Sequence, residues 1–172
     1  SLILIVYNGK TNDEGIILDD GVCARLSDEA WYMCTTSSGV TGIFEWMQWW
    51  LQSGWGDDIH LTNLTEVFSA FNVTGPQSRE VLRRLTTCNL DSNEFPYMSV
   101  RTAEVAGVPC QLMRIGFTGE LSYEIHCPSG YAMHVWESLM QAGGAFGILP
   151  FGIEAQRILR LEKAHIIVGQ DT

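Results

Sequence analysis

Residues 114–128 read RIGFTGELSYEIHCP and place one acidic residue, Glu120, in a turn between two apolar runs. The run after the turn alternates between apolar and polar side chains, which is typical of a half-buried β-strand. Its apolar face consists of Leu121, Tyr123, Ile125 and Cys127, and its polar face of Ser122, Glu124 and His126. Residues 104–117 predict one strand before the turn, so the stretch predicts two strands around a Thr-Gly-Glu turn.

The N-terminal part of the chain predicts a small sheet and a helix. Runs rich in β-branched residues predict strands over residues 2–7, 16–18 and 33–36, with a turn at residues 8–15. Residues 43–51 repeat apolar side chains at helical spacing, and the Ser53-Gly54 pair ends that helix.

A second series of elements begins near His60. Strands are expected after it, followed by a short helix beyond the Gly75-Pro76 turn. Further helices are expected over residues 129–142, with Trp136, Leu139 and Met140 inward, and over residues 153–163, with a last strand over residues 165–172. This order indicates an α+β fold with antiparallel or mixed sheets and packed helices.

The composition argues against several classes of protein. The chain has 20 acidic and 10 basic residues, a net charge of -10, whereas a protein that binds nucleic acid needs a basic surface. The longest apolar run, residues 2–6, is far too short to span a membrane, and no charged segment precedes it as in a signal peptide. We therefore expect neither nucleic acid nor a membrane as a partner.

Five cysteines are present, an odd number without C-x-x-C spacing. Zinc sites usually show paired Cys or His ligands, and disulfide scaffolds are shorter and denser in cysteine. We therefore expect reduced thiols, a cytoplasmic location and no metal site.

Two acidic stretches are candidates for chemistry. In GIILDDG, residues 15–21, Asp19 and Asp20 stand at an expected strand end, and because adjacent strand residues face opposite sides, only one of them can serve a given site. The alternative is that both residues simply cap a turn. Glu120 has two coplanar oxygens that match an amidine-like edge, such as that of a 2-amino-4-oxo pterin, or that pair with Arg114 instead.

Five motifs in order extend this interpretation. They are GIILDDG, VTGPQSREVL, FPYMSV, GFTGELSYEIHCP and GIEAQRILRLEKAHIIVGQDT. Together they resemble the folate-binding aminomethyltransferase family, which includes the T-protein of the glycine cleavage system. They are most similar to the branch formed by the C-terminal folate domain of the α subunit of heterotetrameric sarcosine oxidase.

The resemblance implies roles for three residues. Asp19 would be the catalytic residue, acting electrostatically or as a base near the reacting folate nitrogens. Glu120 would hold the pterin edge, and Phe117 would pack near the pterin. Gln156 stands where T-proteins carry an arginine that helps hold the folate tail, so that role is not transferred.

The resemblance also implies an architecture and a reaction. The family fold is a three-part cloverleaf, and this chain is expected to be a piece of it: residues 1–60 from the middle part, and residues 61–172 from the second half of the first part, ending before the C-terminal barrel. The expected function is transfer of the one-carbon unit of oxidised sarcosine to tetrahydrofolate, giving 5,10-methylenetetrahydrofolate.

Other parts of the complex would supply the rest of the chemistry. FAD, FMN and NAD are expected in the intact complex but not on this chain, its partners are the other sarcosine oxidase subunits, and the isolated chain is expected to be inactive. The alternatives are an aminomethyltransferase of the glycine cleavage system, or a non-catalytic module of the same fold that serves assembly.

Overall fold

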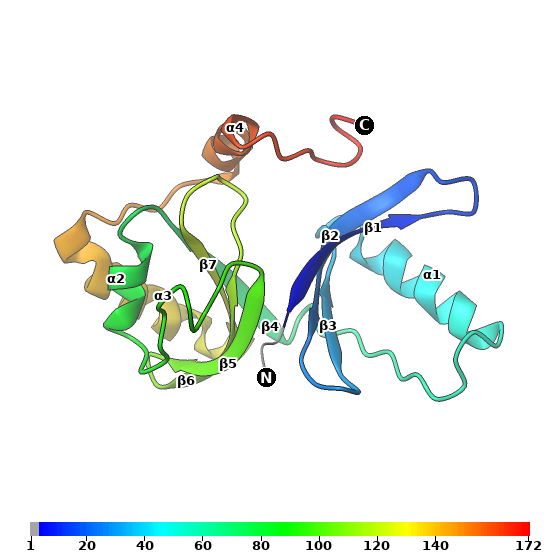
Figure 1. The fold of residues 1–172 in the computed structure, drawn as a ribbon, viewed down its shortest axis with the longest axis horizontal. Coiled ribbons are helices and arrows are strands. Elements are labelled where there is room, and N and C mark those ends of the chain that lie inside the picture. The colour runs from blue at the N-terminus through cyan, green and yellow to red at the C-terminus, as the bar shows by residue number, and fades with distance from the viewer. Residues whose placement is uncertain (1–3) are drawn as a thin grey trace.

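The computed structural model describes residues 4–172 and shows two antiparallel sheets (Figure 1). The first has the order β1-β2-β3, formed by Ile5–Thr11, Ile17–Arg25 and Trp31–Cys34. The second has the order β4-β7-β6-β5, formed by Phe68–Thr74, Ser122–Pro128, Val108–Arg114 and Ser99–Val105. The helices are α1 (Val40–Gln52), α2 (Ser78–Arg83), α3 (Ala132–Gly143) and α4 (Ile153–Glu162). The predicted α+β fold with antiparallel sheets is confirmed.

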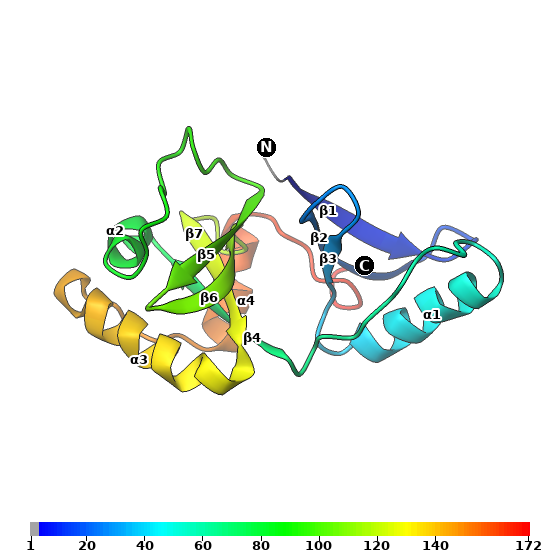
Figure 2. The same cartoon turned by 90° about the horizontal axis from the view of Figure 1, so that it is seen from below.

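Helices cover the outer faces, and the two sheets face each other. Two perpendicular views place α1 on the side of the first sheet that points away from the second, and α2 and α3 on the outer side of the second (Figures 1 and 2). The larger core lies under α2 and α3, where Leu82, Phe95, Tyr123, Ile125 and Val135 are fully or almost fully buried. The predicted apolar face of β7 is thereby confirmed.

A smaller core joins the two sheets. Val22 and Ala24 of β2 pack with Val100 and Met113 of the second sheet. The Ile5 amide donates to the carbonyl of Met98 at 2.8 Å and links the backbones. The space between the sheets is thus walled by one face of β1-β2-β3 and by the face of β5-β6-β7 that turns away from the larger core.

The strands of the first sheet differ from the expected ones. β2 runs through residue 25, so Asp19 and Asp20 lie in the middle of a strand and not at its end. They pair with Lys10 and Gly9 of β1, which continues through part of the expected turn. Pairing along both strands outweighs the turn preference of the Asn, Gly and Asp residues. The expected first strand began at Leu2, and residues 2–3 lie outside the described part.

Three other expectations were wrong. Residues 104–117 are not one strand, because Ala106 and Gly107 have φ of 53° and 76° and make a tight turn between β5 and β6. Residues 165–172 form turns and not a strand. In α3, Val135 and not Trp136 is buried in the core. Trp136 is partly exposed and packs against Phe71.

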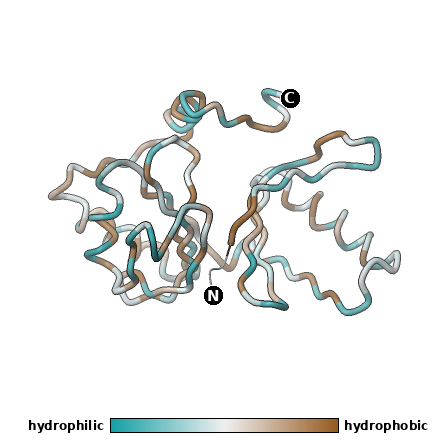
Figure 3. Tube along the Cα trace, viewed as in Figure 1, coloured by the Kyte–Doolittle hydropathy of each residue, from teal (hydrophilic) through white to brown (hydrophobic). Residues whose placement is uncertain are grey.

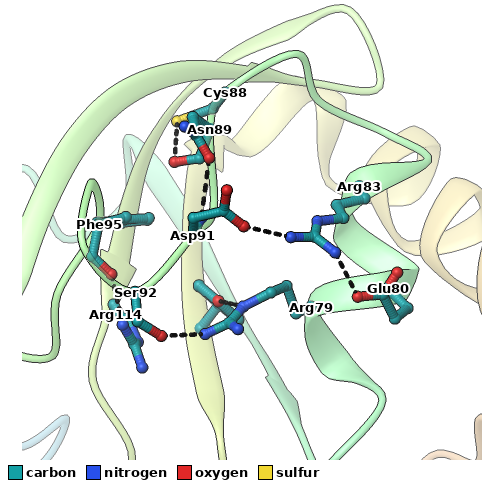
Figure 4. Close-up of polar contacts among 10 residues, drawn as sticks. Arg79, Glu80, Arg83, Cys88, Asn89, Asp91, Ser92, Phe95 and Arg114 are labelled. Carbon is teal, nitrogen blue, oxygen red and sulfur yellow. Dashed lines mark hydrogen bonds and ion pairs between the residues drawn. The ribbon is translucent and has the colours of Figure 1, made fainter.

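Arginines hold the loop between α2 and β5 against the second sheet (Figure 4). Arg79 donates to the Tyr123 hydroxyl and to the Ser92 hydroxyl, both at 3.0 Å. Arg114 donates to the carbonyl of Phe95 at 2.6 Å. The same figure shows Arg83 paired with Glu80 and Asp91. The loop therefore has a fixed course up to the start of β5.

Apolar residues run through the strands of both sheets and also through the segment after α4 (Figure 3). That segment crosses from the second sheet toward the first (Figure 1). Within residues 4–172, none of the helices combines the length and the apolar character that a membrane crossing requires.

Candidate functional site

A cavity of about 290 Å³ lies between the two sheets. Its walls combine aromatic rings with carboxylates and a few small polar groups. The rings are those of Tyr7, Tyr97 and Phe117, the carboxylates those of Asp20 and Glu124, and the further lining residues include Cys34, Thr36, Met98, Gln156 and Ile167. Its volume is at the lower end of the roughly 300–1,000 Å³ typical of small-molecule sites.

The first sheet contributes one face of two strands to this cavity. Tyr7 pairs with Val22, and Asp20 lies two residues away on β2, so both side chains share the inner face. Burial, followed by the charges of Asp20 and Glu124, raises the pKa of Tyr7. Burial and the nearby Glu124 charge raise the pKa of the Cys34 thiol to about 12. The cavity is thus a site of negative potential with neutral hydroxyl and thiol groups around it.

The Thr-Gly-Glu loop contributes Phe117 to the opposite wall. Gly119 has φ of 87°, a conformation that favours glycine, and the buried Thr118 hydroxyl bonds to that of Thr74 at 2.8 Å. The Gly75 amide donates to the carbonyl of Leu121 at 2.9 Å. The V-T-G-P and T-G-E motifs therefore hold each other in place.

Glu120 lies on the exposed side of this loop, outside the residues that line the cavity. None of the hydrogen bonds or ion pairs among residues 4–172 involves its carboxylate, so the alternative of a pair with Arg114 is not realised. The Glu120 carboxylate therefore accepts no donor from the described residues.

Asp19 lies on the other side of β2. It is 2% exposed, and its oxygens accept the amides of Asp20 at 2.9 Å and Thr36 at 3.2 Å. It lines a second hollow with residues of the C-terminal segment, such as Val168 and Gly169, and Thr36 borders both spaces. The structure therefore brings Asp20, and not Asp19, together with Phe117.

Lys10 is a buried cation that no sequence motif pointed to. It is 6% exposed, shares a sheet face with Asp19, and its Nζ has no hydrogen-bond partner within the described residues. Burial lowers the pKa of its ammonium group, against the opposing effect of Asp19 and Asp20.

Sequence reasoning also missed Asp20 and Glu124 as parts of one site. Alternation had already placed Asp20 opposite to Asp19 and Glu124 on the polar face of its strand. The sequence pattern does not show that these two faces lie opposite each other across the space between the sheets.

The residues that the structure describes contain no cluster of metal-ligand side chains. Within residues 4–172, no group of three His, Cys, Asp or Glu side chains is arranged to hold a metal ion, and all five cysteines are unpaired.

Comparison with known proteins places this geometry in a family. The sequence model described as the GCVT N-terminal domain matches residues 4–172. The sarcosine oxidase subunit alpha of Corynebacterium sp. (strain P-1) is 40% identical over 169 residues, which are 96% of this chain and 18% of that protein. The aminomethyltransferase of Halothermothrix orenii is 29% identical over 167 residues, 97% of this chain and 45% of that protein. The chain therefore spans less than half the length of these relatives.

Solved structures share the fold. Glycine cleavage system aminomethyltransferase T from Bartonella henselae has a TM-score of 0.76 at 22% identity, over 97% of this chain and 42% of that chain. A chain of heterotetrameric sarcosine oxidase from Corynebacterium sp. U-96 has a TM-score of 0.60 at 17% identity, over 88% of this chain and 85% of that chain. At these identities the likeness concerns the fold alone, and it confirms the expected aminomethyltransferase fold.

Proposed function

The chain belongs to the GCVT N-terminal domain family, and on that premise we propose that it binds tetrahydrofolate and takes part in transferring a one-carbon unit to it. The observation that carries the proposal is the cavity in which Phe117 and Tyr7 meet two carboxylates between the sheets. A reduced pterin is a flat heterocycle rich in N-H donors, and rings with carboxylate acceptors suit it.

The residues present fit the pterin better than the tail of the folate. The cavity walls offer no Lys, Arg or His among the described residues, and Gln156 lines the wall where a cation would hold a carboxylate tail. We infer that the pterin head enters this space and that the tail extends away from it.

Three residues carry the proposed chemistry. Glu120 holds the donor edge of the pterin, and Phe117, which lines the cavity, packs against its ring. Asp19, which lies on the opposite face of β2 from this cavity, acts across the strand by its charge on the reacting nitrogens. Its two backbone hydrogen bonds fix the carboxylate, and its burial strengthens its field. A bound tetrahydrofolate supplies the nucleophilic nitrogens that accept the one-carbon unit.

The proposed donor is oxidised sarcosine, and the proposed product is 5,10-methylenetetrahydrofolate. Supporting this branch, identity is 40% to a sarcosine oxidase alpha subunit and 29% to an aminomethyltransferase. We infer that the partners are other sarcosine oxidase subunits, that flavin and nicotinamide chemistry lies outside this chain, and that the 172 residues alone do not perform the reaction. Five unpaired thiols favour a reducing, cytoplasmic compartment.

Product analysis of the protein in its full natural length and complex tests the proposal. Sarcosine turnover should give 5,10-methylenetetrahydrofolate when tetrahydrofolate is present and formaldehyde when it is absent. Formaldehyde as the product in both cases contradicts folate transfer and favours an assembly module.

Two neighbouring variants then separate the roles of the paired aspartates. Asp19→Asn should shift the product toward formaldehyde at an unchanged rate of sarcosine oxidation. If Asp20→Asn causes that shift and Asp19→Asn does not, the catalytic role belongs to Asp20. Asp28→Asn, an exposed residue in a turn, is the matched control.

A further inference from the structure

Four tryptophans gather at the C-terminal end of α1. Trp46, Trp49 and Trp50 belong to the helix, and Trp55 follows it in the chain. The Trp50 ring lies at the centre of the group. Its centroid is 4.7 Å from that of Trp49, 4.5 Å from that of Trp55 and 6.3 Å from that of Trp46. Contact with Trp50 therefore fixes the positions of the other rings.

Two rings of this cluster are largely open to solvent. Trp49 is 57% exposed and Trp55 is 72% exposed. Glu45, one turn before Trp49 on the same face of α1, is exposed as well. In two perpendicular views no other helix or strand of the described residues covers the side of α1 that points away from the first sheet (Figures 1 and 2). Large apolar side chains exposed in one place are typical of an interaction surface.

The charge of this region is entirely negative. Residues 26–78 contain six acidic residues and no Lys or Arg. Glu45, Asp57 and Asp58 are exposed, and none of them takes part in an ion pair among residues 4–172. These three residues and the two open rings are called the tryptophan face below: Glu45, Trp49, Trp55, Asp57 and Asp58. The face combines indole rings and carboxylates with no cation from the same segment.

Other aromatic rings of the chain show which group this face lacks. Arg25 lies over Trp31, with 5.5 Å between the guanidinium carbon and the ring centroid, and Arg84 lies over Phe146 at 4.5 Å. Among the described residues no cation lies over Trp49 or Trp55. The face of an indole ring attracts a cation, and neighbouring carboxylates add to that attraction. A partner that supplies Arg or Lys side chains would therefore complete the same arrangement.

We propose that the tryptophan face is a docking surface for a segment of a partner protein that carries exposed arginine or lysine side chains. These cations pack on the Trp49 and Trp55 rings and pair with the carboxylates of the face. Tryptophan and arginine are enriched among the residues that dominate the binding energy of protein interfaces. None of the five residues lines the cavity between the sheets, so this surface is independent of the proposed folate site.

Calorimetry on the protein in its full natural length tests this surface with a peptide of alternating arginine and glycine. The peptide should bind about tenfold or more tightly than the same peptide with citrulline, which keeps the shape of arginine without its charge. Added salt should weaken binding of the arginine peptide, because it screens the exposed carboxylates. Equal affinity for the two peptides, or no binding of the arginine peptide, overturns the proposal.

Single variants locate the binding on the surface. Trp49→Ala and Trp55→Ala should each weaken the arginine peptide about fivefold or more, because each removes a ring with an open face. Trp49→Phe keeps an aromatic ring and should retain more affinity than Trp49→Ala. Trp31→Ala is the matched control: Trp31 is 60% exposed, but Arg25 already lies over its ring, so affinity should not change. Equal losses in Trp31→Ala and Trp49→Ala contradict binding at the tryptophan face.

A second copy of this protein is the alternative occupant of an exposed aromatic surface. Sedimentation of the wild type, Trp49→Ala and Trp55→Ala distinguishes the two occupants. An oligomer that both substitutions dissociate would assign the face to self-association and overturn the proposal of a basic partner. The same oligomeric state in all three proteins, together with selective binding of the arginine peptide, supports it.

Discussion

The imidazole of His165 lies stacked on the ring of Phe117, with 5.4 Å between the centroids and 22° between the planes. The Tyr7 ring lies 6.2 Å from the same imidazole, at 19°. The segment after α4 thus brings a flat ring against aromatic side chains of both walls of the cavity. A buried arginine, Arg160, holds this segment through Asp171 and through the carbonyl of His165 at 2.8 Å.

Replacing Asp171 by Asn should loosen residues 164–172 while the sheets remain folded. The carboxylate accepts from Arg160 and from the Ile167 amide at 2.7 Å, and the amide variant loses the charged pair. Hydrogen exchange of this segment should become about tenfold faster or more, because a charge-assisted bond is lost. Asp28→Asn, which removes an exposed pair with Arg25, is the control.

The same contact predicts a pH dependence. Hydrogen bonds from Arg160 lower the pKa of Asp171, so the contribution of the pair is complete above the ordinary aspartate range and is lost as the pH falls through the lowered value. The protection factors of residues 164–172, which are corrected for the intrinsic pH dependence of amide exchange, should therefore fall at acid pH in the wild type and stay low at all pH values in Asp171→Asn. Equal exchange in the two proteins at neutral pH contradicts the prediction.

Gly21→Ala should be strongly destabilising. A Cβ at this position would lie 2.0 Å from the carbonyl oxygen of Cys34, so β2 and β3 would have to move apart. We expect a loss of about 3 kcal/mol or more in the free energy of unfolding, measured by urea denaturation. Gly9→Ala is the matched control, since its Cβ would meet none of the described residues within 4 Å and the change should be under about 1 kcal/mol. Similar losses for both variants would show that backbone freedom, and not the contact with Cys34, requires Gly21.

The spacing of apolar residues along the chain predicted the strands and helices whose side chains alternate regularly. The alternation of β7 and the helical spacing of α1 need only near neighbours, and both were recognised from the sequence. The β5–β6 turn was missed because Ala106 adopts a positive φ that the residue type does not suggest. Asp19 lies inside β2 and not at its end because β2 pairs with β1 along this part. The residues around Asp19 alone do not indicate that pairing.

The site was harder to predict than the fold. The family motifs pointed to Phe117, which lines the cavity, and to Glu120, which lies outside its lining. Asp20 and Glu124 come from strands about a hundred residues apart, and only the packing of one sheet on the other brings their faces together. The residues that neighbour Asp20 and Glu124 in the chain contain no pattern that indicates this meeting of side chains from two sheets.

Lys10→Met should stabilise the protein at neutral pH. The ammonium group is buried and has no hydrogen-bond partner among residues 4–172, so its removal should raise the free energy of unfolding by on the order of 1 kcal/mol. Because burial lowers the pKa of Lys10, the folded state binds fewer protons than the unfolded state between that value and the ordinary lysine range. The free energy of unfolding of the wild type should therefore increase relative to that of the variant as the pH rises toward about 10.

Denaturation curves from pH 7 to 10 measure this difference. Lys163→Met, at the exposed lysine after α4, is the control and should show no such trend. A Lys10→Met variant that is less stable than the wild type at pH 7 would mean that attraction to Asp19 and Asp20 outweighs the desolvation of the ammonium group.

The bond between Thr118 and Thr74 should be one of the contacts that hold the Thr-Gly-Glu loop on the second sheet. Thr118→Val keeps the shape of the side chain but leaves the Thr74 hydroxyl without its partner, at an expected cost of about 1–2 kcal/mol. Thr74→Val should cost a similar amount, and the double variant should cost clearly less than the sum, since the penalty of an unpaired hydroxyl is no longer present. Additive losses in chemical denaturation would show that the two hydroxyls act independently. Phe117 is adjacent to Thr118 and lines the cavity, so the two single variants should also weaken tetrahydrofolate binding. Thr102→Val, on the β5–β6 hairpin, is the control and should leave binding unchanged.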